Sequence, residues 1–186
     1  MKLKFMIGFF VLFFITGRSF AQMSYLDIGS EMYKYPEVEW LKGEPVKTFE
    51  KDKIYVIELW ATWCGPCVAQ MPHINQLARK FENANVVFIG QNVMEPDRTK
   101  VVDFVQKKGD GMGYRIAFSG PSGSHFEKEW LKPAGVISIP QTFLIQDNKL
   151  LWQTTPNMLN EEVIQLLIDH KFSIEAAMKI NEKGSH

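Results

Sequence analysis

The residues of this chain best suited to chemistry are its two cysteines, Cys64 and Cys67, which are separated by Gly65 and Pro66. A thiolate attacks disulfides, whereas the protonated thiol does not. A bridge across so short a loop removes little entropy from the unfolded chain, because the benefit of a disulfide grows with loop length. We therefore interpret the pair as a reactive centre that opens and closes, rather than as a structural staple.

The elements on either side place this pair at a strand-to-helix turn. The run Ile54–Trp60 is rich in β-branched and aromatic residues and predicts a buried strand. Apolar residues then recur at helical spacing over 65–82, where Pro72 predicts a kink. The free N–H groups and the dipole at a helix N-terminus lower the pKa of a thiol. We expect Cys64 to be the nucleophile and Cys67, one turn further in, to be the resolving thiol.

The neighbours of the two cysteines suit an exposed reactive turn. Pro66 fits the first turn of a helix, where its missing donor costs nothing. Gly65 leaves the adjacent sulfur open to a partner, and Trp63 is expected to form an apolar lip beside Cys64. We therefore expect Trp63, Gly65 and Pro66 to contact the substrate.

Glu58 is the one charged residue in the strand before the cysteines. If its side chain is buried, its pKa is raised, because burial disfavours the charged form. Glu58 could then accept the proton of Cys67, through a water molecule. The alternative is a carboxylate that points to solvent at a strand edge.

The remaining chain alternates strands and helices. Further strands are predicted over 38–41 (a short edge strand), 86–90, 114–118, 142–146 and 150–154, and further helices over 96–108, around 126–130 and after Asn160. Asp147-Asn148 predicts a hairpin turn, and Asn181–His186 is expected to be a frayed tail. This order predicts an α/β fold with a central mixed β-sheet flanked by helices.

The N-terminus has the layout of a secretory signal peptide over residues 1–21. Lys2 and Lys4 precede the uncharged, largely apolar run 5–16, and Ser19-Phe20-Ala21 supplies small residues at the expected cleavage site. The run is shorter than the roughly 20 apolar residues of a membrane-spanning helix. The alternative is an uncleaved segment that anchors the protein to the membrane. The sequence predicts export in either case.

Composition excludes several classes of protein. The 186 residues suit one domain, and 46% are apolar, as in globular proteins. Lysine plus arginine and aspartate plus glutamate number 21 each, without the basic excess of a nucleic-acid-binding protein. Two cysteines and four histidines offer no second pair at zinc-site spacing, so we expect no metal and no cofactor beyond the cysteine pair.

The segment Trp60-Ala-Thr-Trp-Cys-Gly-Pro-Cys67 resembles the active-site segment of thioredoxins and of their exported TlpA/ResA-like relatives. The resemblance runs from about Val46 to Phe172. Glu58 falls where the family places a buried carboxylate, usually an aspartate. The segment 95–113 resembles the insert that the TlpA-like branch carries between the second strand and the next. A thioredoxin-like fold is therefore implied.

The same resemblance assigns the segment before the strand 142–146. Pro140 matches the family's proline whose peptide bond is cis and faces the cysteines. A cis bond there would present the backbone of Ile139 to an extended substrate. The implied organisation is a signal peptide (1–21), an N-terminal extension (22–45) and a thioredoxin-like domain (46–186).

The resemblance implies a thiol–disulfide oxidoreductase that reduces disulfides of other exported proteins. Gly-Pro between the cysteines is similar to reducing thioredoxins, whereas oxidants of the superfamily often have Pro-His there. A membrane protein would be the electron donor, and the periplasm the place of action. No pattern in the sequence indicates an oligomeric state.

Two other functions stay open. A thiol peroxidase is suggested by the insert, although the peroxiredoxin pattern Pro-x-x-x-Thr-x-x-Cys is missing around Cys64. A non-catalytic module is the second alternative, in which the cysteines hold a soft metal such as copper(I) or the domain docks a partner. A cis-Pro140 beside the cysteines would hinder the metal.

Overall fold

The structure is a computed structural model that describes residues 25–184. The predicted signal peptide, residues 1–21, lies outside the described residues. Within 25–184, none of the helices is long and apolar enough to cross a membrane.

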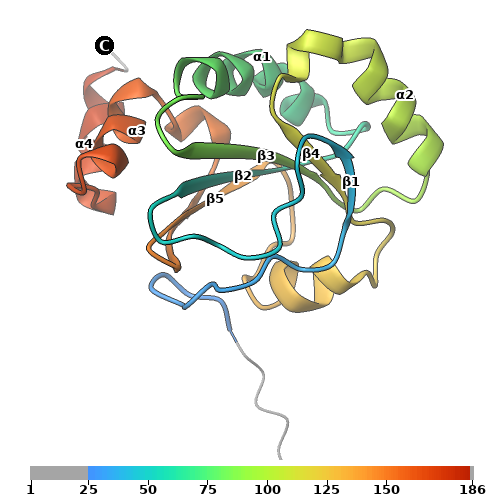
Figure 1. The fold of residues 1–186 in the computed structure, drawn as a ribbon, viewed down its shortest axis with the longest axis horizontal. Coiled ribbons are helices and arrows are strands. Elements are labelled where there is room, and N and C mark those ends of the chain that lie inside the picture. The colour runs from blue at the N-terminus through green and yellow to red at the C-terminus, as the bar shows by residue number, and fades with distance from the viewer. Residues whose placement is uncertain (1–24, 185–186) are drawn as a thin grey trace, which may run out of the picture.

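A six-stranded mixed sheet forms the centre of the molecule (Figure 1). Its strands, in spatial order, are β1 (Glu39–Lys42), β4 (Arg115–Phe118), β3 (Val86–Asn92), β2 (Ile54–Trp60), β5 (Gln141–Gln146) and β6 (Lys149–Thr154). The three strands β2, β3 and β4 are parallel, and the pairs β1·β4, β2·β5 and β5·β6 are antiparallel. The predicted mixed sheet and the short edge strand near 38–41 are confirmed.

Helices cover both faces of this sheet. On one face lie α1 (Gly65–Lys80), α2 (Arg98–Lys108), α3 (Glu161–Ile168) and α4 (Ile174–Lys183), and on the other lies the π-helix Glu127–Leu131 (Figure 1). Short 3-10 helices span Gly109–Met112 and Pro156–Met158. The predicted insert between β3 and β4 consists of α2 and the 3-10 helix that follows it.

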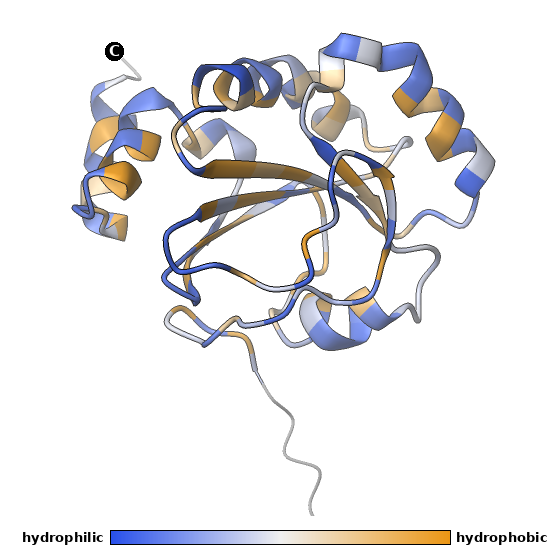
Figure 2. Ribbon diagram, viewed as in Figure 1, coloured by the Kyte–Doolittle hydropathy of each residue, from blue (hydrophilic) through white to orange (hydrophobic). Residues whose placement is uncertain are grey.

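Two hydrophobic clusters, one on each face, enclose the sheet, whose strands are apolar along most of their length (Figure 2). All seven residues of β2 are buried, because β2 lies between β3 and β5 and is covered on both faces. Val56 and Trp60 belong to the cluster beneath α1, and Ile57 and Leu59 to the opposite cluster. Strand alternation therefore directs Glu58 toward α1.

Two local predictions have clear outcomes in the backbone. Asp147 and Asn148 both have positive φ angles, 52° and 59°, as the predicted tight hairpin turn requires. The frayed tail predicted over 181–186 is wrong for residues 181–183, which belong to α4. Residues 185 and 186 lie outside the described residues. Helix α4 docks on the domain: Ala177 is fully buried, and Asn181 donates to the carbonyl of Met158 at 3.0 Å.

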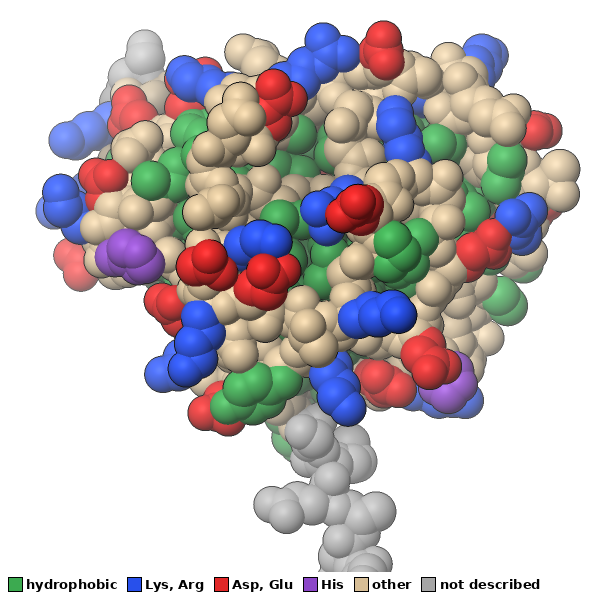
Figure 3. Space-filling view, viewed as in Figure 1, with side chains coloured by type: hydrophobic (Ala, Val, Ile, Leu, Met, Phe, Trp, Pro, Cys, Tyr) green, Lys and Arg blue, Asp and Glu red, His purple; other side chains and the backbone are tan. Residues whose placement is uncertain are grey.

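Acidic and basic side chains are intermingled over the face of the molecule in Figure 3. This pattern agrees with the equal numbers of acidic and basic residues in the sequence. On this face no single sign of charge dominates.

Candidate active site

The two cysteines lie at the turn between the end of β2 and the start of α1. Cys64 is the N-cap of α1, with φ −83° and ψ 91°, and its Sγ accepts a hydrogen bond from the backbone N–H of Cys67 at 3.2 Å. Pro66 occupies the first turn of the helix, as expected. The sulfur atoms of Cys64 and Cys67 are bonded to each other, with 5.3 Å between the Cα atoms. The positive end of a 16-residue helix therefore lies at Cys64.

The two cysteines have different surroundings. Both are buried, at 4% and 3% exposed. A Cβ added to Gly65 would meet nothing within 4 Å, and Trp63 is 54% exposed. By contrast, the Sγ of Cys67 lies 3.9 Å from the carbonyl oxygen of Leu59, inside the domain. Cys64 therefore borders the open side of the turn.

Glu58 is buried, which excludes the solvent-facing alternative. It is 5% exposed, and its Oε2 accepts a hydrogen bond from the Thr142 hydroxyl at 2.5 Å. Its other carboxyl oxygen is buried without a partner among the described residues. Burial raises the pKa of Glu58 from an ordinary 4.5 to about 8, and the hydrogen bond from Thr142 lowers it only in part. The carboxyl group is therefore mostly, but not entirely, protonated at neutral pH.

Gly90 is the register partner of Glu58 on β3, and the space over Gly90 is tightly filled. A Cβ at Gly90 would meet the rings of Tyr114 and Trp60 at 2.9 and 3.2 Å. Burial, and secondarily the charge of Glu58, raise the pKa of Tyr114 well above its ordinary value. Neither ring supplies a charge that would draw the proton from Glu58.

The peptide bond Ile139-Pro140 is cis, as the family resemblance implied. Gln141 pairs with Leu59 in the β2·β5 ladder, so Ile139 and Pro140 lie just beyond the end of this ladder. This is the same edge of the sheet at which β2 leads into the cysteine turn. Pro140 also borders a surface groove of about 650 Å³. The structure thus brings Cys64, Cys67 and the cis bond to one edge of the sheet, with Glu58 two residues before the end of β2.

Two polar residues of this region were not predicted from the sequence. Thr142 contacts Glu58, and Glu95 is 3% exposed and accepts hydrogen bonds from Thr62. Both contacts join residues more than 30 positions apart. No periodicity or motif marks such pairs.

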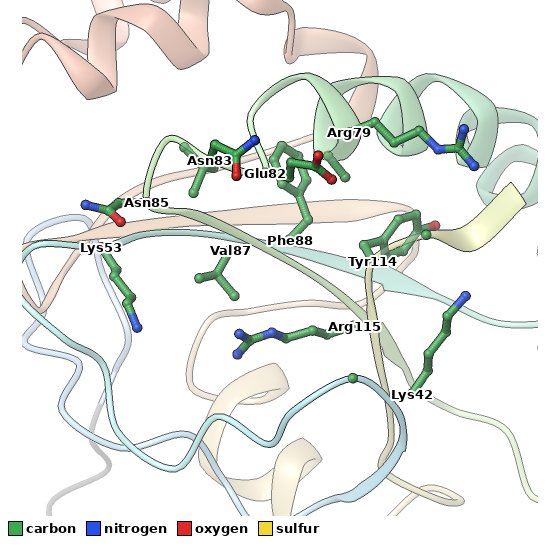
Figure 4. A pocket seen from close by; sticks show the side chains of 14 residues that line it. Lys42, Lys53, Arg79, Glu82, Asn83, Asn85, Val87, Phe88, Tyr114 and Arg115 are labelled. Atoms are coloured by element: carbon green, nitrogen blue, oxygen red, sulfur yellow. The ribbon is translucent and has the colours of Figure 1, made fainter. Parts of the chain in front are cut away.

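A second cavity, of about 640 Å³, lies at the opposite ends of the parallel strands (Figure 4). It contains no cysteine. In Figure 4 the side chains of Lys53 and Arg115 point toward the space beside Val87, whereas Lys42 and Arg79 extend away from it. Lys42 and Arg79 donate to backbone carbonyls of the segment 109–112. These cations therefore do not converge on one point. Within residues 25–184, no cluster of side chains suited to a metal ion is found.

Comparison with known proteins identifies the family. The family model described as Redoxin matches residues 34–163. The chain is 26% identical over 167 residues to Protein FixW of Rhizobium leguminosarum, covering 87% of this chain and 75% of that one. It is 28% identical over 150 residues to the thiol-disulfide oxidoreductase ResA of Bacillus cereus, covering 80% and 81%.

A solved structure shares the fold. The crystal structure of a candidate thiol-disulfide oxidoreductase from Bacteroides vulgatus superposes with a TM-score of 0.60 at 24% identity, covering 79% of this chain and 98% of that one. With a thioredoxin-like fold and a bonded cysteine pair at the head of α1, the chain belongs to the Redoxin family and is a thiol–disulfide oxidoreductase.

Proposed function

We propose that this protein is an exported reductant of disulfides in other extracytoplasmic proteins. The observation that carries the proposal is the Cys64–Cys67 disulfide at the N-terminus of α1, with Cys64 as the N-cap. The helix N-terminus stabilises a thiolate on Cys64 once the disulfide is opened. The relative named ResA, described as a thiol-disulfide oxidoreductase, supports the same chemistry.

The reaction consists of two exchanges. The Cys64 thiolate attacks one sulfur of the substrate disulfide, so a mixed disulfide forms and the other substrate sulfur leaves as a thiolate that takes a proton. Cys67 then loses its proton and attacks the Sγ of Cys64, which releases the second substrate thiolate. The substrate gains two electrons and two protons, and the Cys64–Cys67 disulfide is left. No cofactor beyond this disulfide takes part.

Glu58 is the proposed proton acceptor of Cys67. Its carboxyl group lies on the face of β2 that is turned toward α1 and is removed from bulk water. A carboxylate there accepts the proton of Cys67 through a water molecule, and the neutral acid returns it when a donor reopens the disulfide. Since the pKa of Glu58 is about 8, both forms are accessible near neutral pH.

The proposed substrate-binding surface surrounds Cys64. Trp63 supplies an exposed apolar lip, and Gly65 and Pro66 leave the sulfur approachable. Ile139, next to the cis bond, lies outside the β2·β5 ladder, and we propose that its backbone pairs with an extended segment of the substrate. Cysteine-containing segments in an extended conformation fit this surface best.

The proposed partners follow from the direction of the reaction. A reductant leaves each cycle oxidised and needs an upstream donor, which we propose is a membrane protein that carries electrons across the membrane.

The proposed export rests on the signal-like residues 1–21. The periplasm is the proposed location, with membrane anchoring if the signal is retained. Recovery of a chain beginning at Gln22 from the extracytoplasmic fraction would support cleavage, and retention of the full chain in the cytoplasm would contradict export.

The deciding experiment is a redox titration of the purified protein in glutathione buffers, read by alkylation of Cys64 and Cys67. A potential near that of thioredoxin, about −270 mV, supports a reductant. A potential near about −120 mV identifies an oxidant and refutes the proposed direction.

A second experiment tests the roles of the two cysteines. Cys67→Ser should accumulate mixed disulfides with a protein substrate, whereas Cys64→Ser should not. Trapping by Cys64→Ser alone would reverse the assigned roles.

A further inference from the structure

The segment Val93–Glu95, between β3 and α2, holds the turn that precedes Cys64. The carboxyl oxygen Oε2 of Glu95 accepts two hydrogen bonds from Thr62, one from its backbone N–H at 3.1 Å and one from its hydroxyl at 2.5 Å. Glu95 is only 3% exposed. A carboxylate that is removed from water is tolerated when it is hydrogen-bonded in this way.

Met94 reaches the next residue of the turn. Its carbonyl oxygen accepts a hydrogen bond from the indole N–H of Trp63 at 3.3 Å. Met94 has a φ of +55°, a left-handed conformation that costs free energy for a residue with a side chain. Such residues persist where neighbouring contacts determine the backbone, and they are concentrated at functional sites. Val93 adds a fourth hydrogen bond, which its N–H donates to the carbonyl of Trp60 at 2.9 Å.

These contacts hold the chain directly before Cys64. Thr62 lies two residues before Cys64, and the N–H of Cys64 donates to the carbonyl of Ala61 at 3.1 Å. A displacement of Thr62 would therefore move the Trp63 indole and the N-cap together.

From this geometry we infer that Glu95 is a positioning residue of the redox centre, which orients Trp63 and Cys64 for the substrate by binding Thr62. The inference rests on the proposed function, because it assigns the surface around Cys64 to substrate binding. Small displacements of a reacting group are costly: about 1 Å can lower a rate by roughly 100-fold. Within residues 25–184, Glu95 is hydrogen-bonded to Thr62 and to neither cysteine, so it acts through the turn.

The test compares three variants with the unmodified protein. Glu95→Ala removes the acceptor of both Thr62 bonds, whereas Glu95→Gln keeps a carbonyl oxygen that accepts both. Asp97→Ala is the matched control, because Asp97 is an acidic residue of the same connection whose side chain caps α2 through the N–H of Lys100 at 3.0 Å. Reduction of insulin with dithiothreitol as donor gives kcat/KM. The change in tryptophan emission between oxidised and reduced protein, with the contribution of Trp63 obtained by difference from Trp63→Phe, reports the turn.

We expect Glu95→Ala to lower kcat/KM about tenfold and to reduce the Trp63 emission change, while Glu95→Gln and Asp97→Ala stay within about twofold of the unmodified protein. If Glu95→Ala and Asp97→Ala behave alike in both measurements, Glu95 serves only stability and the inference is wrong. If folded Glu95→Gln falls as far as Glu95→Ala, the charge and not the hydrogen bonds matters, and the inference is also wrong.

Two further arms keep the test decisive. If Glu95→Ala does not fold, Thr62→Val replaces it, because valine keeps the branched shape and loses only the hydroxyl donor. We expect Thr62→Val to lower kcat/KM and the Trp63 emission change in the same direction, and unchanged values would overturn the inference. If the unmodified protein fails to reduce insulin, the proposed function fails, while the emission change still tests the positioning of Trp63 separately.

Discussion

At the scale of single residues, Glu58 lowers stability at neutral pH. Its side chain is buried in the central strand, with one oxygen bonded to Thr142 and the other without a described partner. The cost of burying its charge is what raises its pKa to about 8. A buried group that pays such a cost is expected to serve the chemistry of the site rather than the packing of the core.

The pH dependence of stability follows from this pKa. Below about pH 4.5 Glu58 is protonated in both the folded and the unfolded chain, but between about 4.5 and 8 only the unfolded chain releases the proton. The free energy of unfolding therefore falls as pH rises, by about 1.4 kcal/mol per unit from this group. Glu58→Gln removes that slope. The free energy of unfolding of the variant, relative to that of the unmodified protein, should therefore increase as the pH rises to about 8. Urea unfolding of the oxidised proteins at several pH values checks this, and an advantage that does not vary with pH would contradict it.

At the scale of elements, β3 contains a glycine in its interior, which ordinarily weakens a strand. The structure explains Gly90 by the side chains that cross over it: the rings of Tyr114 and Trp60 occupy the space that a Cβ would fill. Gly90 also pairs with Glu58 across the β2·β3 ladder. The missing side chain on β3 thus makes room for the packing around the carboxyl group on β2.

Gly90→Ala should lower the free energy of unfolding by about 1–3 kcal/mol, the usual cost of overpacking a filled core. Its Cβ would lie 2.9 Å from Tyr114 and 3.0 Å from Ile116. Gly111→Ala is the matched control, since a Cβ there meets nothing within 4 Å, and it should change stability by less than about 0.5 kcal/mol. Equal effects of the two substitutions in chemical denaturation would contradict this account of β3.

At the scale of the whole molecule, the redox state of the cysteines is coupled to folding. The fold holds Cys64 and Cys67 within bonding distance at the end of the sheet, and both are buried in the cluster beneath α1. Folding and disulfide formation are linked by a thermodynamic cycle. If the cysteine pair is a stronger reductant in the folded protein than in the unfolded chain, forming the disulfide stabilises the folded protein. A difference of 30 mV corresponds to about 1.4 kcal/mol.

For a reductant we therefore expect the oxidised protein to unfold with a larger free energy than the reduced protein, by at least about 1 kcal/mol. Thermal or urea unfolding with and without dithiothreitol measures the difference. Cys67→Ser, which forms no internal disulfide, should show no such effect. A more stable reduced form would indicate an oxidant, as in a protein whose reduced state is the stabilised one.

Much of this protein could be predicted from the order of its residues. The strand Ile54–Trp60, the helix that starts after Cys64 and the hairpin at Asp147-Asn148 were all predicted, because each depends on local pattern and turn chemistry. The helix α4 was not, since its 10 residues carry an apolar face that needs a partner. Residues 181–183 are helical because α4 packs against α3 and the segment 156–158.

The sequence by itself determined the redox pair, since Cys64-Gly-Pro-Cys67 combines both thiols and the start of a helix within four residues. Only the tertiary structure decided that Glu58 is buried, that Thr142 binds it, and that Glu95 holds Thr62. Each of these facts joins strands or loops that are distant in the chain. Burial and hydrogen bonding between such segments depend on how the sheet is assembled, and no local pattern of residues encodes that.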